Sequence, residues 1–278
     1  MQILLTNDDG IYAPGLMALR EELAKLGEVS VVAPAIEQSG VGHSITFLTP
    51  LMAKEVYQGG AGGRSERIGW AVEGSPADCV KLALAKFVPQ GPDLVVSGIN
   101  GGLNVGINVL YSGTVAAATE AALNDLPSIA VSLEYDEQPR FDRAAPIARR
   151  VIEMMLKRNA WQDHLLYNLN IPTSATQDSP ASGASAPGLQ GEAGGADALP
   201  APLQISTMNV SRWPAEFEER RDPKNRRYYW ASGTLPDPKT DPESDLAGIR
   251  AGKITLTPLT IDRTKSDLLD KMRSWELE

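Results

Sequence analysis

The chain has 278 residues, of which 42% are hydrophobic and 22% charged, and it carries a net charge of −9. This balance is typical of a soluble globular protein and disfavours a surface that holds nucleic-acid phosphates, so we expect no stable nucleic-acid complex. No stretch approaches the roughly 20 apolar residues that span a bilayer. The single cysteine, Cys79, excludes an internal disulfide framework. We therefore expect a cytoplasmic protein without membrane association.

Strand and helix patterns alternate through residues 1–172. An apolar run at residues 3–6 predicts a buried strand, and a helix that begins at Pro14 places Leu16, Leu19 and Leu23 on one face. Further strands are expected at 29–33, 94–96, 129–133 and 165–171, and further helices at 76–87, 114–123 and 142–158. Short apolar strands separated by helices predict an α/β fold with a Rossmann-like, doubly wound, mostly parallel sheet, and we expect residues 1–172 to form the catalytic core.

Three segments depart from this alternation. Residues 44–57 and 67–72 predict a β-hairpin insertion. Residues 173–202 are rich in Ala, Gly, Ser and Pro, which predicts a flexible insertion because they cannot bury enough apolar surface to offset the ordering entropy. Residues 203–278 predict short extended segments and a closing helix at 265–275. We expect an extended C-terminal arm for oligomerisation, which packs on the main domain or on another subunit. The basic residues of that arm are expected in a solvated loop, with an oligomer contact as the less favoured alternative: Arg220, Arg221, Lys224, Arg226 and Arg227.

Two adjacent carboxylates, Asp8 and Asp9, follow the first predicted strand directly. One interpretation is a plain turn, because Asn7 and Gly10 flank the pair and all four residue types favour turns. The other is a cation site, because two unpaired charges at the end of a buried strand would cost several kcal/mol of desolvation. Taken alone, this motif leaves both interpretations open.

Two more polar loops follow neighbouring strands. Ser39 lies in the loop after the second strand, and Asn100 lies in a Gly-rich segment after the strand at 94–96. Because the carboxyl ends of parallel strands meet at one edge of the sheet, these side chains should converge on Asp8 and Asp9. Such an all-oxygen set suits Mg²⁺ or Mn²⁺ better than zinc, so the sequence predicts a divalent-cation site with open positions for substrate.

An anion site is predicted beside this cation site. Ser112, Gly113 and Thr114 stand before an Ala-rich helix that Thr114 can cap, and free amides at a helix start attract phosphate. The glycines fit neither a Walker loop nor a dinucleotide fingerprint. His43 is expected at the same sheet edge as a general acid, a phosphate contact or a simple loop hydrogen-bonder, whereas His164 is expected to be structural.

Four motifs in this order resemble the SurE (survival protein E) family of metal-dependent 5'/3'-nucleotidases: LLTNDDGIYAPGL, QSGVGHSIT, VSGINGGLNVG and YSGTVAAATEAAL. The segments RRYYWASG and SDLAGIRAGKITLTPL resemble the C-terminal signatures of the family, so the resemblance covers nearly the whole chain except 173–202. It implies a Rossmann-like fold, and homodimers or homotetramers that exchange C-terminal arms. It also implies metal ligands at Asp8, Asp9, Ser39 and Asn100, and phosphate contacts at Asn104, Ser112, Gly113 and Thr114 with His43 nearby.

The leading hypothesis is a divalent-metal phosphomonoesterase that hydrolyses nucleoside 5'- and 3'-monophosphates. In it a metal-activated water attacks phosphorus, and Asp8 or Asp9 accepts the proton. A mechanism through an aspartyl-phosphate is less well supported. Enzymes of that type carry an Asp-x-Asp motif after the first strand, whereas the two acids are adjacent here. A protein that senses nucleotides without turnover is the alternative from another class.

Overall fold

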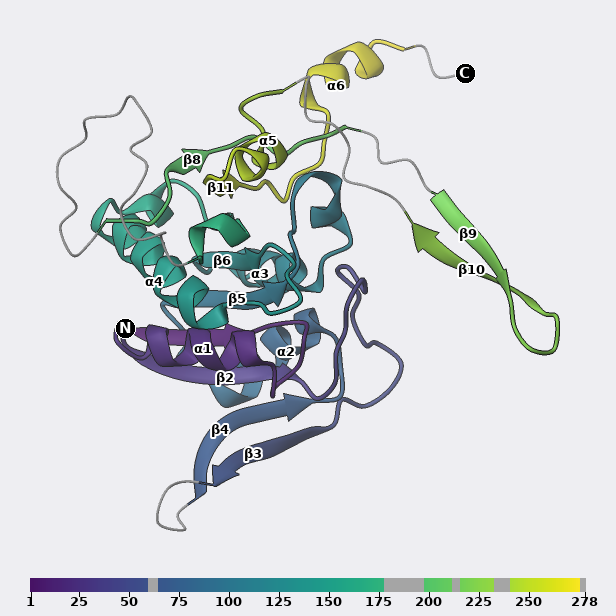
Figure 1. Cartoon of the computed structure of the whole chain (residues 1–278). Coiled ribbons are helices and arrows are strands. Elements are labelled where there is room, and N and C mark those ends of the chain that lie inside the picture. Colours follow the sequence, from purple (N-terminus) through teal and green to yellow (C-terminus); the bar gives the residue numbers. More distant parts are fainter. Residues whose placement is uncertain (60–64, 178–197, 212–215, 233–240, 276–278) are drawn as a thin grey trace, which may run out of the picture.

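The computed structural model describes residues 1–59, 65–177, 198–211, 216–232 and 241–275, and it shows an α/β fold (Figure 1). The strands are β1 (Gln2–Thr6), β2 (Glu28–Pro34), β3 (Ala53–Gly59), β4 (Ser65–Val72), β5 (Leu94–Gly101), β6 (Ser128–Leu133), β7 (Leu166–Ile171), β8 (Leu203–Ile205), β9 (Glu216–Arg221), β10 (Arg227–Ser232) and β11 (Ile254–Pro258). The α-helices are α1 (Pro14–Leu23), α2 (Pro76–Leu82), α3 (Gly113–Ala122), α4 (Phe141–Lys157), α5 (Asp245–Arg250) and α6 (Ser266–Arg273).

Nine of these strands form one sheet in the order β3-β4-β2-β1-β5-β6-β7-β11-β8. The pairs β1–β2, β1–β5, β5–β6 and β6–β7 are parallel, as expected for a doubly wound core. The chain runs from β1 to β2 on one side and later returns to β5 on the other side of β1. This reversal makes the carboxyl ends of β1 and β5 the topological switch point, where open α/β sheets form their ligand crevices.

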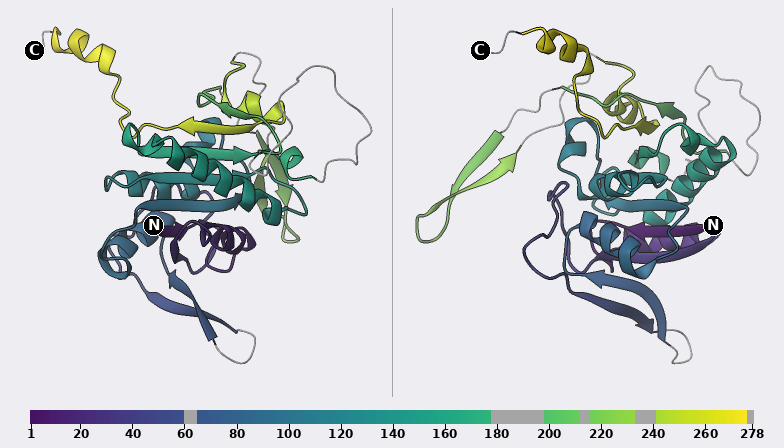
Figure 2. Two further views of the ribbon diagram at one scale, coloured as in Figure 1. Left: turned by 90° about the vertical axis from the view of Figure 1, so that its left-hand side faces the viewer. Right: turned by 180° about the vertical axis from the view of Figure 1, so that it is seen from behind.

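Helices cover both faces of the sheet (Figures 1 and 2). Helix α1 packs beside α4, and α2 packs beside α3 on the opposite face. Leu16, Leu19 and Leu23 of α1 are fully buried against the sheet, which confirms the predicted apolar face. Helix α3 is buried almost throughout because its alanines let it lie close to the sheet, and its start is thereby fixed at the switch point.

The β-hairpin insertion is confirmed, but its first strand is shorter than predicted. Strand β3 begins at Ala53, so residues 44–52 are not the strand expected from Ser44 onwards. Ser44 and Thr46 instead bind the start of α2 through Ser75 and Asp78, which removes them from sheet pairing. The second strand, β4, pairs in parallel with β2 and so extends the main sheet.

Parts of the C-terminal segment 203–278 belong to the main sheet. Strand β11 pairs antiparallel with β7, and β8 pairs in parallel with β11. Strands β9 and β10 form a separate antiparallel hairpin that stands away from the sheet (Figure 1). The prediction that the basic residues lie in a loop was therefore wrong for three of them. Arg220 and Arg221 lie in β9, and Arg227 lies in β10.

The ends of the expected insertion at 173–202 pack against the protein. A short 3₁₀ turn at Thr173–Ala175 buries Ala175, and Leu199 lies against the core cluster. The described ends of the segment thus lie against the core, and the flexible insertion stays a prediction. The rest of the expected insertion, residues 178–197, lies outside the described residues. None of the helices in the described part of the chain has the length and apolarity required to cross a membrane.

Replacing Leu19 by Ala tests the face of α1. The side chain of Leu19 is 0% exposed, so Leu19→Ala should lower the free energy of unfolding by about 2–5 kcal/mol, the usual cost of such a cavity. Urea denaturation measures this change. The control is Leu48→Ala, at a side chain that is 92% exposed, where the change should stay within about 0.5 kcal/mol. Equal losses in the two variants would contradict the assigned core.

Candidate functional site

The acidic pair lies at the carboxyl end of β1, and the flanking residues form the turn that aims it. The side chain of Asn7 closes this turn twice: its Nδ2 donates to the Gly10 carbonyl over 3.0 Å, and its Oδ1 accepts from the Gly10 N–H over 3.1 Å. Asp8 is only 3% exposed, and Asp9 is less deeply buried. The turn and the carboxylate cluster are therefore parts of one structure rather than alternatives.

Two distant segments meet at Asp8. The Thr114 hydroxyl donates to Asp8 Oδ1 over 2.6 Å, and the N–H of Gln38 donates to the Asp8 carbonyl over 2.7 Å. At Gly113 a Cβ atom would lie 2.8 Å from the Asp8 Cβ, so only glycine allows the start of α3 this close to β1. The predicted convergence of the loop after β2, the start of α3 and the acidic pair is thus present.

Burial perturbs both carboxyl groups. Burial raises the pKa of Asp8, and the hydrogen bond from Thr114 offsets part of that shift. Burial, the neighbouring charge of Asp8 and the charge of Glu37 raise the pKa of Asp9 to about 6, while the N–H of Gly101 acts in the opposite direction. Among the described residues, the groups that perturb these two carboxyls include no cation. Within the described residues, therefore, no positive side chain counters the effect of burial on the two carboxyls.

Asn100 lies in β5 and Ser39 lies in the loop after β2, and these two strands flank β1. Strand β5 extends beyond the expected residue 96 to Gly101, since residues 100 and 101 still pair with β6 after an irregularity. At that irregularity Gly98 has φ +143°, and a Cβ there would lie 2.4 Å from the Val131 carbonyl oxygen. Asn100 Nδ2 donates to the Gly102 carbonyl over 2.7 Å, which leaves Oδ1 as its available ligand atom.

Ser39 is joined to a carboxylate that the sequence did not assign. Its hydroxyl donates to Glu37 Oε1 over 2.7 Å, and Glu37 acts electrostatically on both Asp8 and Asp9. Glu37 stands two residues before Ser39 on the predicted ligand loop, and that proximity is the signal that could have identified it. The loop after β2 therefore brings a third acidic side chain towards the site.

The start of α3 differs from the prediction in its cap. The helix begins at Gly113, so Ser112 is the N-cap and its Oγ accepts from the Val115 N–H over 3.1 Å. The expectation that Thr114 caps the helix was wrong, because Thr114 lies inside the first turn and its hydroxyl serves Asp8. The start of α3 nevertheless lies beside the acidic pair, where amides and carboxylates can act on one phosphate ester.

Asn104 lies in a buried amide network between β5 and β7. Its Nδ2 donates to Ser132 Oγ over 2.8 Å, its N–H donates to Asn170 Oδ1 over 2.9 Å, and its carbonyl accepts from Asn168 Nδ2 over 2.7 Å. These contacts favour a structural role in holding the segment before α3. A phosphate contact by Asn104 stays a prediction.

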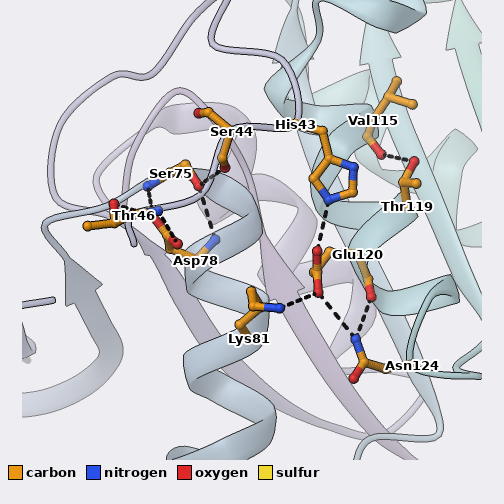
Figure 3. A network of polar contacts seen from close by, with 10 residues as sticks. All are labelled: His43, Ser44, Thr46, Ser75, Asp78, Lys81, Val115, Thr119, Glu120 and Asn124. Carbon is orange, nitrogen blue, oxygen red and sulfur yellow. Dashed lines mark hydrogen bonds and ion pairs between the residues drawn. The ribbon is translucent and has the colours of Figure 1, made fainter. Parts of the chain in front are cut away.

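His43 lies over α3, where it contacts a carboxylate that the sequence also left unassigned (Figure 3). Its Nε2 lies 2.9 Å from Glu120 Oε2, and Lys81 Nζ donates to Glu120 Oε1 over 3.1 Å. His43 and Ser112 both line a cavity of about 680 Å³ that runs along α3. A lone acid in an Ala-rich buried helix was the signal in the sequence for Glu120.

Fold and site together define an α/β protein with a buried acidic pair and a helix start at the switch point of its sheet. The chain belongs to the family described as survival protein SurE, whose model matches residues 3–187. It is 49% identical to the 5'-nucleotidase SurE of Rhodopirellula baltica, over 100% of this chain and 99% of that protein, and 39% identical to the 5'-nucleotidase SurE of Desulforudis audaxviator, over 100% and 98%. It also resembles the crystal structure of the SurE protein from Aquifex aeolicus, with TM-score 0.77, 29% identity and 98% of each chain covered.

Replacing Thr114 by Val tests the environment of Asp8. Because burial raises the pKa of Asp8 above 3.8, the stability that depends on this carboxyl falls as the pH rises and the group ionises. Thr114→Val removes a donor to the ionised form, so the free energy of unfolding, measured with EDTA present, should fall by about 1–3 kcal/mol near neutral pH and by less near pH 5.

Thr119→Val on the same helix is the control for this variant. The Thr119 hydroxyl donates to the Val115 carbonyl and touches neither carboxylate, so its small effect should not vary with pH. A loss at Thr114 that is the same at both pH values would show that Asp8 does not depend on this hydroxyl.

Proposed function

We propose that this protein is a metal-dependent phosphomonoesterase that hydrolyses nucleoside 5'-monophosphates, and also 3'-monophosphates, to nucleoside and phosphate. The observation that carries the proposal is the buried pair Asp8–Asp9, which lies against the start of α3 at the switch point. An anionic substrate can bind beside two carboxylates only if a cation lies between them, so the arrangement suits a metal and a phosphate ester. Relatives named 5'-nucleotidase SurE that match over the whole chain support the same reaction.

The donor set fits a hard divalent cation, Mg²⁺ or Mn²⁺. The four proposed ligands, Asp8, Asp9, Ser39 and Asn100, offer only oxygen atoms. Burial raises the pKa of each carboxyl, and no cationic side chain among the described residues counters this shift, so the pair fits a divalent cation as its partner. Among the described residues, no group of three or more His, Cys, Asp and Glu side chains forms a ready site. This agrees with Mg²⁺, which uses one or two carboxylates and fills other positions with water and substrate phosphate.

A bound cation would polarise the phosphoryl group and make a water molecule more acidic. The residues of the chain supply the rest of the chemistry. The amides at the start of α3 and the Ser112 hydroxyl bind phosphoryl oxygens as negative charge develops on them. Asp9, the more exposed of the two carboxylates, accepts the proton of the attacking water. His43 lines one cavity with Ser112, and in this proposal it meets the oxygen that leaves with the nucleoside.

Two other proposals have less support. An aspartyl-phosphate mechanism requires one free carboxylate oxygen as nucleophile, whereas Asp8 is nearly inaccessible and its Oδ1 accepts from Thr114. Clean trapping of a phosphorylated aspartate with labelled substrate would favour it. A sensor that binds nucleotides without turnover has no use for a cation placed beside a phosphate site, and tight binding without phosphate release across a panel of mononucleotides would favour it.

We also propose a cytoplasmic homodimer or homotetramer in which C-terminal arms are exchanged. Helix α6 buries none of its side chains within the chain, and Leu268, Met272 and the nearby Trp275 are exposed. The β9–β10 hairpin also exposes Phe217 and Trp230. Apolar side chains exposed on projecting elements are typical of surfaces that pack on another copy.

Replacing Asp9 by Asn tests the reaction. Asn keeps the size of the side chain but can neither balance the cation nor accept the proton, so kcat for AMP with Mn²⁺ should fall at least about 100-fold. Colorimetric phosphate release measures it, and EDTA should abolish release by the unsubstituted protein. The control is Asp125→Asn, at an exposed acid before β6 and therefore at the opposite edge of the sheet, which should keep full activity. Full activity of Asp9→Asn with an intact circular dichroism spectrum would contradict the site.

A further inference from the structure

Glu120 is the buried acid of the site region for which the proposed reaction has no use. Its side chain is only 6% exposed, and its two oxygens have different partners. Oε2 lies 2.9 Å from His43 Nε2, while Oε1 accepts from Lys81 Nζ over 3.1 Å and from Asn124 Nδ2 over 3.4 Å (Figure 3). Burial raises the pKa of this carboxyl, but the hydrogen bonds from His43 and Lys81 outweigh it, so the pKa lies below the ordinary value.

An ionised Glu120 determines which nitrogen of His43 carries the proton. A carboxylate only accepts hydrogen bonds, so a contact of 2.9 Å requires a hydrogen on Nε2. In the neutral ring Nδ1 then has a free lone pair, and in the charged ring Nδ1 also carries a hydrogen. The side chain therefore presents Nδ1 as its reactive atom in both states.

The backbone on both sides of His43 is held independently of Glu120. The N–H of Gly42 donates to the Tyr111 carbonyl over 2.9 Å, which joins this loop to the residue before Ser112. On the other side, the N–H and hydroxyl of Thr46 donate to Asp78, at distances between 2.7 and 3.1 Å. The position of the loop is thus fixed by α2 and the start of α3, and Glu120 is left to orient the ring.

Nδ1 lies on the side of the ring that faces Val115 and Thr119 (Figure 3). Within the described residues Nδ1 makes no hydrogen bond. His43, Val115 and Thr119 line the cavity along α3 together with Ser112, which marks the end of that cavity near the acidic pair. Among the described residues, the charged groups near the ring include Lys81 on α2, and Asp262 and Arg263 after β11 line the same cavity.

We propose that Glu120 is a positioning residue that holds His43 with its Nε2–H bound, so that Nδ1–H protonates the leaving nucleoside oxygen; this inference rests on the proposed function. In the step, water forms the new P–O bond and the bond from phosphorus to the ribose oxygen breaks. Its electron pair stays on that oxygen, which takes the proton from Nδ1. The proton of the water passes to Asp9, which releases it to solvent, and solvent returns a proton to His43, so phosphate and nucleoside leave with the chain unchanged.

Glu120→Gln removes the charge and keeps the size of the side chain. The variant should lower kcat for AMP about 30- to 100-fold with little change in KM, because the ring loses the contact that fixes its orientation. For the AMP analogue with sulfur in place of the bridging ester oxygen, the loss should be less than about threefold, since a thiolate leaves without a proton. The double variant His43→Asn/Glu120→Gln should be no slower than His43→Asn.

Lys81→Gln is the matched control, because it removes a charge from the other oxygen of the same carboxylate and leaves the His43 contact in place. Its kcat for AMP should stay within about twofold of the unsubstituted protein. Equal losses on AMP and on the sulfur analogue in Glu120→Gln, or a similar loss in Lys81→Gln, would overturn the inference.

The tautomer of His43 provides a test that does not depend on activity. In ¹⁵N NMR spectra at a pH where the ring is neutral, with signals assigned by comparison with His43→Asn, the proton should reside on Nε2, and Glu120→Gln should shift the population towards Nδ1–H. A proton already on Nδ1 in the unsubstituted protein contradicts the inference. Absence of AMP hydrolysis by the unsubstituted protein would instead overturn the proposed function.

Discussion

The burial of two adjacent carboxylates at the end of β1 is the constraint on which the site depends. Each isolated charge removed from water costs several kcal/mol, and like charges side by side add to that cost. The raised pKa values of Asp8 and Asp9 are the result. The fold compensates with the hydroxyl of Thr114 and the N–H of Gly101, yet within the described residues it supplies no cation. A divalent cation would offset the remaining cost, which is why we propose that this pair binds one.

Sheet topology explains why these groups meet. Strand β1 is flanked by β2 and β5, so the segments that follow all three strands leave from one edge. Small residues permit the close approach: Gly113 brings the start of α3 against Asp8, and Gly98 brings β5 against β6. A side chain at either position would displace the segment that carries a proposed ligand or phosphate contact. Gly98 and Gly113 therefore allow close packing of the backbone and are not part of a dinucleotide-binding motif.

Much of this arrangement could be predicted from the sequence. The period of apolar residues identified the core strands and helices, and parallel topology then implied that Asp8, Asp9, Ser39 and Asn100 share an edge. Local sequence did not reveal that Thr114 serves Asp8 rather than the cap, since that contact joins residues 106 positions apart. It did not reveal that Glu120 meets His43 either, because 77 positions separate them. Contacts of this kind arise only when α3 lies on the sheet, and no local pattern encodes them.

Anomalous diffraction from a crystal grown with Mn²⁺ tests the central claim most directly. The account predicts one strong manganese peak with oxygen atoms of Asp8 and Asp9 about 2.1 Å away, within reach of Asn100 and the Ser39 loop. The same crystal with a phosphate analogue should show the anion between the metal and the start of α3. A manganese peak at another place in the chain, or none at saturating metal, would contradict the account.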